Sequence, residues 1–285
     1  MSSEAKVDLH MHTTFSDGKL TPTELVELIV AQDLKVASIT DHDTTAGLDE
    51  AIDAASRYST VDLVPGIEIS ADHPSGQGDV HILGYFIDYK EPNLQAKLDE
   101  LQNDRKQRGK YMVERLAELG LPVEWERVVE IAGEGSVGRP HIAQAMLERG
   151  YISNFKEAFD EYLNDQGKAY VDRPRISIED TVALIQRAGG LAVLAHPIYV
   201  HEFEALLPRL ADIGMVGMEV HYSEFNKQAQ NRLTRLALAN GLLPCGGSDY
   251  HGTGSSNEHL PGSAGPPMEV FDQLAKLAKI HKGTL

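Results

Sequence analysis

The sequence contains very little of what would stabilise a secreted or membrane protein. Cys245 is its single cysteine, so no disulfide can form within the chain, and we expect a small buried residue there. No apolar run approaches the ~18 residues that a membrane-spanning helix requires. The polar residues 1–6 are followed by no apolar signal segment. These absences lead us to expect a cytoplasmic protein that does not associate with a membrane.

Basic residues are also scarce. The 26 lysines and arginines stand against 43 acidic residues, which gives a net charge of −17. Such a surface argues against broad capture of long nucleic acid, including duplex DNA, but a local site can still bind a small anion. Apolar residues make up 42% of the chain, as in an ordinary globular protein. Nothing in the sequence indicates an obligate protein partner.

Strand and helix patterns alternate through most of the chain. We expect strands at 6–11, 36–40, 61–70, 80–88, 191–195, 216–220 and 242–246. Expected helices cover 21–33, 47–58, 178–188, 201–213, 227–240 and 268–280. Only helical periodicity is found between 91 and 168. The pattern therefore predicts an α/β barrel domain from 1–90 and 169–285, with a mostly parallel sheet, and a helical insertion at 91–168.

Residues that bind metals gather where the expected strands end. His10 and His12 are two apart, so both side chains point to the same face of a strand, and Asp249 and His251 repeat that spacing. Further residues of this kind at strand ends are Asp41, His42, Asp43, Glu68 and His196. A lone histidine at a strand end is usually structural. Six such elements at the same end of successive strands instead predict a metal site, because sites in these folds form there.

Four segments together resemble the polymerase-and-histidinol-phosphatase (PHP) family. They are His10–Gly18 (H-x-H-T-x-x-S-D-G), Thr40–Thr44 (T-D-H-D-T), Ala195–Pro197 (A-H-P) and Gly247–Gly252 (G-S-D-x-H-G). They occur in the family's order and extend over the whole chain outside the insertion. Within the insertion, Gly138–Ala143 (G-R-P-H-I-A) is similar to a segment of the subgroup of 3′,5′-nucleotide bisphosphate phosphatases and 5′-to-3′ exoribonucleases.

The resemblance implies a distorted (β/α)7 barrel with three metal ions. The first ion would be bound by His10, His12, Glu68 and Asp249, the second by Glu68, His81 and His196, and the third by Asp17, His42 and His251. His81 is assigned by the resemblance alone, because Val80–Leu83 also reads as an ordinary strand. Histidinol phosphatases often have histidine where this chain has Asp17, which favours the nucleotide-directed subgroup.

Imidazole and carboxylate ligands suit borderline divalent ions, and we expect Mn²⁺, with Fe²⁺ or Zn²⁺ as alternatives. Three divalent ions and three carboxylates leave a site of about +3, which attracts phosphate. We expect hydrolysis by a metal-bridging hydroxide, because coordination lowers the pKa of water to about 7. The residues expected to act in catalysis are Asp17, Glu68, His196, Asp249 and His251.

Substrate-binding candidates come from the insertion. Arg139 and His141 would hold the substrate phosphate, unless they merely begin a solvated helix, and Lys168 would add a further cation. Asp43 would orient His42 or cap a helix.

Two residues at the end of the strand 216–220, Glu219 and His221, lie at the same rim. They are candidates for supporting the metal ligands or the leaving group.

Three functions remain open from the sequence. The first is removal of phosphate from a small nucleotide, such as a 3′,5′-bisphosphate, and the second is trimming of short RNA from a 5′-phosphate end. The third is a metal-stabilised binding module without catalysis. A basic groove on the insertion would favour the nuclease, but we expect its five candidate residues to be a solvated helix face: Arg105, Lys106, Arg108, Lys110 and Arg115.

Overall fold

The computed structural model describes residues 6–76, 78–172, 174–254 and 258–284. Its sheet has the strand order β1-β2-β3-β4-β6-β7-β8, and β5 pairs with β3 at the side. The strands are β1 (Val7–Asp8), β2 (Val36–Ile39), β3 (Asp62–Asp72), β4 (Asp79–Tyr85), β5 (Ile176–Ser177), β6 (Leu191–Leu194), β7 (Gly217–Tyr222) and β8 (Leu243–Gly247). The short strand β5 was not predicted from the sequence.

The sheet is a nearly closed barrel, as predicted. Its two edge strands, β1 and β8, are joined just beyond their ends by backbone hydrogen bonds. The N–H of Asp249 donates to the carbonyl of His10 at 2.8 Å, and the N–H of His12 donates to the carbonyl of Tyr250 at 2.9 Å. The barrel therefore closes at the segments that carry the metal-type residues, which brings residues 10–12 next to residues 249–250.

The sheet is mostly parallel, with one exception. β4 runs antiparallel to both of its neighbours, β3 and β6. The reason is local: only residues 73–78 separate β3 from β4, too few for a crossover helix, so the chain turns straight back. The start of β4 consequently lies at the same rim as the ends of the parallel strands.

Helices surround the barrel. They are α1 (Pro22–Ala31), α2 (Leu48–Ser56), α7 (Ile178–Arg187), α8 (Phe203–Asp212), α9 (Lys227–Ala239) and α10 (Met268–Thr284), with a 3₁₀ turn at Pro197–Tyr199. Thr21 begins α1 with the expected cap: its side chain accepts from the N–H of Glu24, whose carboxylate accepts from the N–H of Thr21. No helix in the described ranges is long and apolar enough to cross a bilayer.

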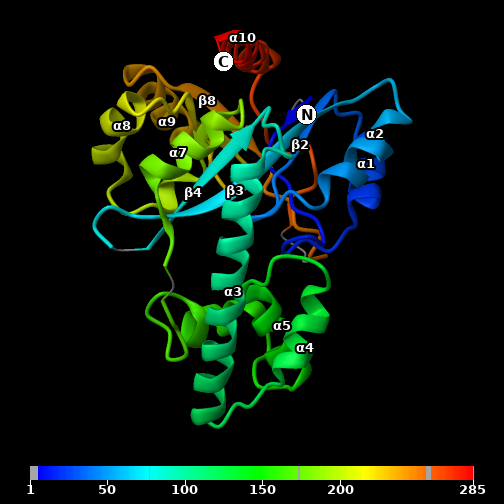
Figure 1. Cartoon of the computed structure of the whole chain (residues 1–285), viewed down its shortest axis with the longest axis vertical. Coiled ribbons are helices and arrows are strands. Elements are labelled where there is room, and N and C mark those ends of the chain that lie inside the picture. Colours follow the sequence, from blue (N-terminus) through cyan, green and yellow to red (C-terminus); the bar gives the residue numbers. More distant parts are fainter. Residues whose placement is uncertain (1–5, 77, 173, 255–257, 285) are drawn as a thin grey trace.

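In the sequence, a second group of helices separates the two segments that form the barrel. It consists of α3 (Pro92–Glu118), α4 (Trp125–Ala132), α5 (Arg139–Glu148), α6 (Phe155–Ala158) and a π-helical turn at Phe159–Leu163. Figure 1 shows α3 running from the barrel into a lower lobe, with α4 and α5 beside its far end. The domain limits at 91 and 168 stay a prediction.

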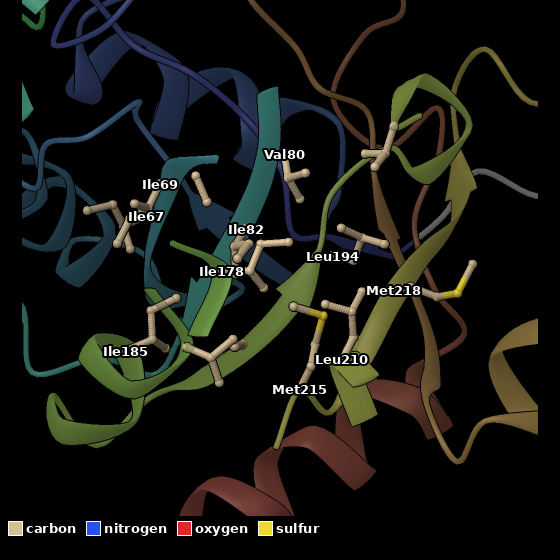
Figure 2. Close-up of a cluster of buried hydrophobic side chains, with 14 of the residues drawn as sticks. Ile67, Ile69, Val80, Ile82, Ile178, Ile185, Leu194, Leu210, Met215 and Met218 are labelled. Atoms are coloured by element: carbon tan, nitrogen blue, oxygen red, sulfur yellow. The ribbon is translucent and has the colours of Figure 1, made fainter. Parts of the chain in front are cut away.

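The helix α3 belongs to two hydrophobic cores. Leu94, Leu98 and Leu101 pack with the barrel, whereas Met112 and Leu116 pack with α4 and α5 in the lobe. Figure 2 shows part of the barrel core, where Ile67, Ile69 and Ile82 of the sheet face α7. One continuous helix thus fixes the lobe to the barrel.

Replacing Ile82 by alanine tests this core. Ile82 is fully buried in β4, so the substitution removes apolar contacts and leaves a cavity. We expect the free energy of unfolding to fall by about 2–5 kcal/mol in urea denaturation. The control is Ile280→Ala in α10, where the side chain is 65% exposed and the change should stay within about 0.5 kcal/mol. Equal losses in both variants would contradict the placement of Ile82.

Candidate metal centre

Glu68, in β3, lies at the centre of a cluster of imidazoles. Its side chain is 1% exposed, and five histidine nitrogens approach its two oxygens. Oε1 lies 2.9 Å from His81 Nδ1 and 3.1 Å from His196 Nε2. Oε2 lies 3.1 Å from His10 Nε2, 3.2 Å from His12 Nε2 and 3.1 Å from His42 Nδ1.

Two further carboxylates complete the cluster. Asp249 Oδ1 lies 3.2 Å from His10 Nε2 and 3.1 Å from His12 Nε2. Asp17 Oδ1 lies 3.4 Å from His251 Nε2, and its Oδ2 lies 3.9 Å from His42 Nε2. The barrel therefore brings together all nine residues that the resemblance implied as ligands.

The ligand atoms form three groups in which all atoms lie within 4.8 Å of one another. These groups are His10, His12 and Asp249; His42, Glu68 and His81; and His12, Asp17, His42 and His251; the predicted ligand His196 belongs to none of them. His12 and His42 each belong to two groups, which the predicted assignment does not include. The division of ligands among ions stays a prediction.

The donor atoms fit a set of cations better than a set of hydrogen bonds. His10 Nδ1 lies 3.1 Å from Glu219, and His10 Nε2 faces both Glu68 and Asp249. If Nδ1 donates to Glu219, Nε2 can face two carboxylates only with positive charge between them, either a proton on the ring or a metal ion. In addition, three of the buried side-chain atoms that lack a hydrogen-bond partner among the described residues belong to this cluster: Asp17 Oδ1, His42 Nδ1 and His196 Nδ1.

The electrostatics lead to the same conclusion. Burial raises the pKa of Asp17, but the charges of His251 and His42 outweigh it and hold the pKa well below its usual range. Burial likewise lowers the pKa of His12, but Asp249 and Glu68 raise it to about 10. The carboxylates thus stay ionised and the site stabilises positive charge at its centre, as a cation site must.

Strand β7 provides none of the nine clustered side chains but contacts three of them, His10, His196 and Asp249. Glu219 is fully buried, accepts from the N–H of His196 at 2.7 Å and contacts His10. Tyr222 donates its hydroxyl proton to Asp249 Oδ2 at 2.7 Å. Residues three apart on a regular strand point to opposite faces, but an irregularity between Glu219 and His221 leaves Val220 without a partner on β8. This bulge turns Glu219 and Tyr222 to the same side.

Two of the three ligands that β7 contacts have unusual backbones. His196 has φ of 26° and Asp249 has φ of 55°, in the region that only glycine adopts readily. Such conformations cost on the order of 1–3 kcal/mol and persist where surrounding contacts fix them. The hydrogen bonds from β7 are such contacts.

Two other buried carboxylates support the site: Asp8, which sequence reasoning missed, and Asp41, which it named only as a metal-type residue at a strand end. Asp8 accepts from the N–H groups of His10, Ser248 and Gly262, and burial raises its pKa to about 6. Asp41 accepts from the hydroxyls of Thr13 and Ser16, both at 2.6 Å. The signal for Asp8 was present, because it precedes His10 and His12 at the same two-residue spacing.

The predicted substrate-binding residues have different surroundings. Arg139 begins α5 and lines a cavity together with His42 and His81. His141 is buried and accepts from the N–H of Gly138, so it does not lie on a solvated face.

Lys168 points elsewhere. Its ammonium lies 2.7 Å from Glu161, and its side chain is 57% exposed. It does not line the cavities that border the cluster.

The expectation of a solvated helix face on α3 is wrong for two arginines. Arg105 and Arg108 are 7% and 5% exposed and line the same cavity as Arg139. They continue the apolar stripe of Leu98 and Leu101 at alternating three- and four-residue spacing, which places them on the buried side of the helix.

The structure excludes one of the two roles predicted for Asp43, that of a helix cap on α2, and its role in orienting His42 stays a prediction. Asp43 accepts from Arg105 Nε at 2.6 Å and from the N–H of Ser70, while the cap position of α2 is occupied by Gly47.

A nearly closed α/β barrel with a buried histidine–carboxylate cluster at its rim defines a metal-dependent hydrolase. Similarity to known proteins identifies the family within this class. The PHP domain family matches residues 8–237, and the chain belongs to this family. It is a metal-dependent phosphoesterase.

Relatives with established names share most of the chain. The 5′-3′ exoribonuclease Rnm of Salmonella typhimurium is 34% identical over 249 residues, covering 86% of this chain and 84% of that protein. The 3′,5′-nucleoside bisphosphate phosphatase of Chromobacterium violaceum is 32% identical over 261 residues, covering 90% of each. A solved metal-dependent phosphoesterase from Bifidobacterium adolescentis superposes with a TM-score of 0.84 at 31% identity, covering 94% of each chain.

Replacing Glu219 by glutamine tests the role of β7. The amide group would face one of two N–H donors, so His10 or His196 would lose its orientation. We expect affinity for divalent metal to fall roughly 10- to 100-fold in a metal titration. Glu202→Gln is the control, because that side chain is 76% exposed. A folded Glu219→Gln protein with unchanged metal affinity would show that β7 does not position the ligands.

Proposed function

We propose that this phosphoesterase removes the 3′-phosphate from a small 3′,5′-bisphosphate nucleotide, such as adenosine 3′,5′-bisphosphate, and leaves the 5′-monophosphate. The observation that carries the proposal is the position of the cluster between two small cavities. Asp17 and Pro140 line both of them. A phosphate ester at the cluster can therefore extend into either cavity.

The larger cavity has the size of a nucleoside site. Its volume is about 370 Å³, within the usual range for small-molecule pockets. Asp249 and His251 line it, and Tyr222 and Phe155 add aromatic rings. An aromatic surface beside the cluster supports a substrate with a base as well as a phosphate.

The nine clustered side chains would hold the metal ions, which we take to be three, with Mn²⁺ first and Fe²⁺ or Zn²⁺ as alternatives. When bound, such ions supply an activated water and neutralise phosphoryl oxygens. The protein's own residues fix the geometry. Glu219 and Tyr222 orient His10, His196 and Asp249, and Arg139 borders the cluster with a planar fork of donors suited to phosphate.

The overall reaction adds water to the phosphorus atom. A new P–O bond forms to the water oxygen, and the bond between phosphorus and the 3′-oxygen breaks. The 3′-oxygen takes up a proton, so the products are a nucleoside 5′-monophosphate and inorganic phosphate.

Charge favours a small substrate over a long one. The larger cavity is bordered by Glu224 and Glu258 as well as Lys19, and the chain carries a net charge of −17. Arg105 and Arg108 are buried, so they do not contribute to an exposed basic surface. Long nucleic acid needs an extended cationic surface.

Exoribonuclease activity on short RNA is the second candidate. It is favoured by the relative from Salmonella typhimurium, at 34% identity. The same cluster would serve both reactions, since each breaks a bond between phosphorus and a 3′-oxygen. A non-catalytic module is the weakest alternative, because both named relatives are enzymes.

The deciding measurement compares two substrates on Mn²⁺-loaded protein: adenosine 3′,5′-bisphosphate and a short 5′-phosphorylated RNA. We expect fast phosphate release from the bisphosphate and little shortening of the RNA. Chelation should abolish the activity, and added Mn²⁺ should restore it. Efficient stepwise shortening of the RNA would instead favour the nuclease.

Asp249→Ala is the matched inactive variant, because Asp249 contacts both His10 and His12. We expect phosphate release below detection in Asp249→Ala and unchanged release in Asp53→Ala, where the side chain is 71% exposed. Activity retained in Asp249→Ala would place the chemistry outside this cluster.

A further inference from the structure

The Asp17 carboxylate lies on a loop between β1 and α1. Its Oδ1 lies 3.4 Å from His251 Nε2, which is longer than an ordinary hydrogen bond. The position of the carboxylate therefore depends on how residues 13–18, which we call the Asp17 loop, are held. From the barrel, Asp41 holds the loop by accepting from the hydroxyl of Ser16 at 2.6 Å.

The lobe holds the same loop from the other side. The N–H of Ser136 donates to the carbonyl of Phe15 at 2.8 Å. Beside it, a side-chain carbon on Gly135 would lie only 2.6 Å from the carbonyl oxygen of Thr14, so only glycine allows this approach. The segment before α5 thus packs backbone against backbone on the Asp17 loop.

His141, in the first turn of α5, adds a second bond between the lobe and the loop. The residue is 4% exposed, and burial lowers its pKa, so the ring is neutral. Its Nδ1 accepts from the N–H of Gly138 at 2.9 Å, which leaves the proton on Nε2. The ring also hydrogen-bonds the backbone of Ser16, where Nε2 is the donor and the carbonyl accepts. One imidazole therefore joins α5 to the residue that precedes Asp17.

His42, a neighbour of Asp17 in the cluster, is also supported from the insertion. The residue after it, Asp43, accepts from Arg105 Nε at 2.6 Å. The side-chain amide of Gln102 donates to the carbonyl of Asp43 at 3.2 Å. Both donors belong to α3, so this helix fixes the backbone beside His42.

One group of potential ligands therefore depends on the insertion. We call it the Asp17 group, and its members are His12, Asp17, His42 and His251. The ligands that β7 contacts are supported within the barrel instead. The cluster thus has two separate sets of supports, one in the barrel and one in the lobe.

We propose that His141 is a positioning residue, which holds the Asp17 carboxylate in its group through the backbone of Ser16. The inference rests on the proposed function, which takes the cluster to bind three ions, and adds that one of these ions depends on the lobe. Without the bond, the loop is free on its lobe side and one carboxylate ligand is misplaced, while the ligands supported by β7 keep their geometry. This role replaces the phosphate contact expected for His141 from the sequence.

A Mn²⁺ titration of the metal-free full-length protein tests the proposal. Asp17→Asn weakens a ligand of the group itself, so it identifies the ion concerned. His141→Leu loses both hydrogen bonds of the ring, and we expect its affinity for that same ion to fall by about tenfold to a hundredfold. The other ions should bind as in the wild type. His141→Gln has an amide with both an acceptor and a donor, and should restore part of the affinity.

A second variant moves the loop without changing His141. In Gly135→Ala the new carbon meets the carbonyl of Thr14, so the affinity for the same ion should fall. Its control is Gly283→Ala, where a new side-chain carbon has no described atom within 4 Å.

The control for His141→Leu is Asn154→Ala. It removes another helix cap of the lobe, because Asn154 accepts from the N–H of Glu157 at the start of α6. Both controls should bind every ion as the wild type does.

Three results would overturn the positioning role. The first is an equal loss of affinity for every ion in His141→Leu, which would show a general loosening of the cluster. The second is unchanged metal binding with a raised KM for adenosine 3′,5′-bisphosphate, which would make His141 a substrate contact. The third is unchanged metal binding in both His141→Gln and Gly135→Ala when His141→Leu does not fold.

Failure of the proposed function would look different. The titration contains no substrate, so it decides the role of His141 even when the wild type releases no phosphate from adenosine 3′,5′-bisphosphate. That result would refute the proposed function alone. If Asp17→Asn bound every ion as tightly as the wild type, the positioning role would be wrong whatever the substrate.

Discussion

The structure of this site depends on one carboxylate. Glu68 lies within 3.2 Å of five imidazole nitrogens that come from four separate segments of the chain. A carboxylate has too few lone pairs to accept from all of them while Asp249 competes for two, so the arrangement is stable only with positive charge shared across it. The barrel holds this set together, because the ends of the parallel strands and the start of the antiparallel β4 lie at the same rim. A phosphate ester is the natural ligand of such a centre.

Most of the fold could be predicted because its pattern is local. Strand and helix periodicities identified every barrel strand except the two-residue β5, and the capping sequence at Thr21 placed the start of α1 correctly. The antiparallel direction of β4 could not be read from periodicity. It follows from the short connection 73–78, and it explains why His81 near the start of a strand joins residues at the ends of others.

The cluster was predictable to a similar degree, and its supports only in part, because Glu219 was named as a support and Tyr222 was not. Most of the clustered histidines and carboxylates can be recognised by residue type and spacing at strand ends, whereas His81 and Asp17 were assigned by the family resemblance. Glu219 and Tyr222 act together only because of a bulge at Val220, and a bulge has no clear sequence signature. The burial of Arg105 and Arg108 was not predicted, because their charge was given more weight than their position on the helix. Their spacing from Leu98 and Leu101 already placed them on the buried stripe of α3.

The length of α3 has a consequence for folding cooperativity. The helix has 27 residues, about 40 Å, with one end packed in the barrel core and the other in the lobe. Arg105 and Arg108 lie near its middle, between the two cores. If the lobe unfolded alone, the exposed half of the helix would fray toward these arginines and weaken the ion pair of Arg105 with Asp43. Lobe and barrel are therefore expected to melt in a single transition, and neither half should survive as a stable fragment when the chain is cut at the middle of α3.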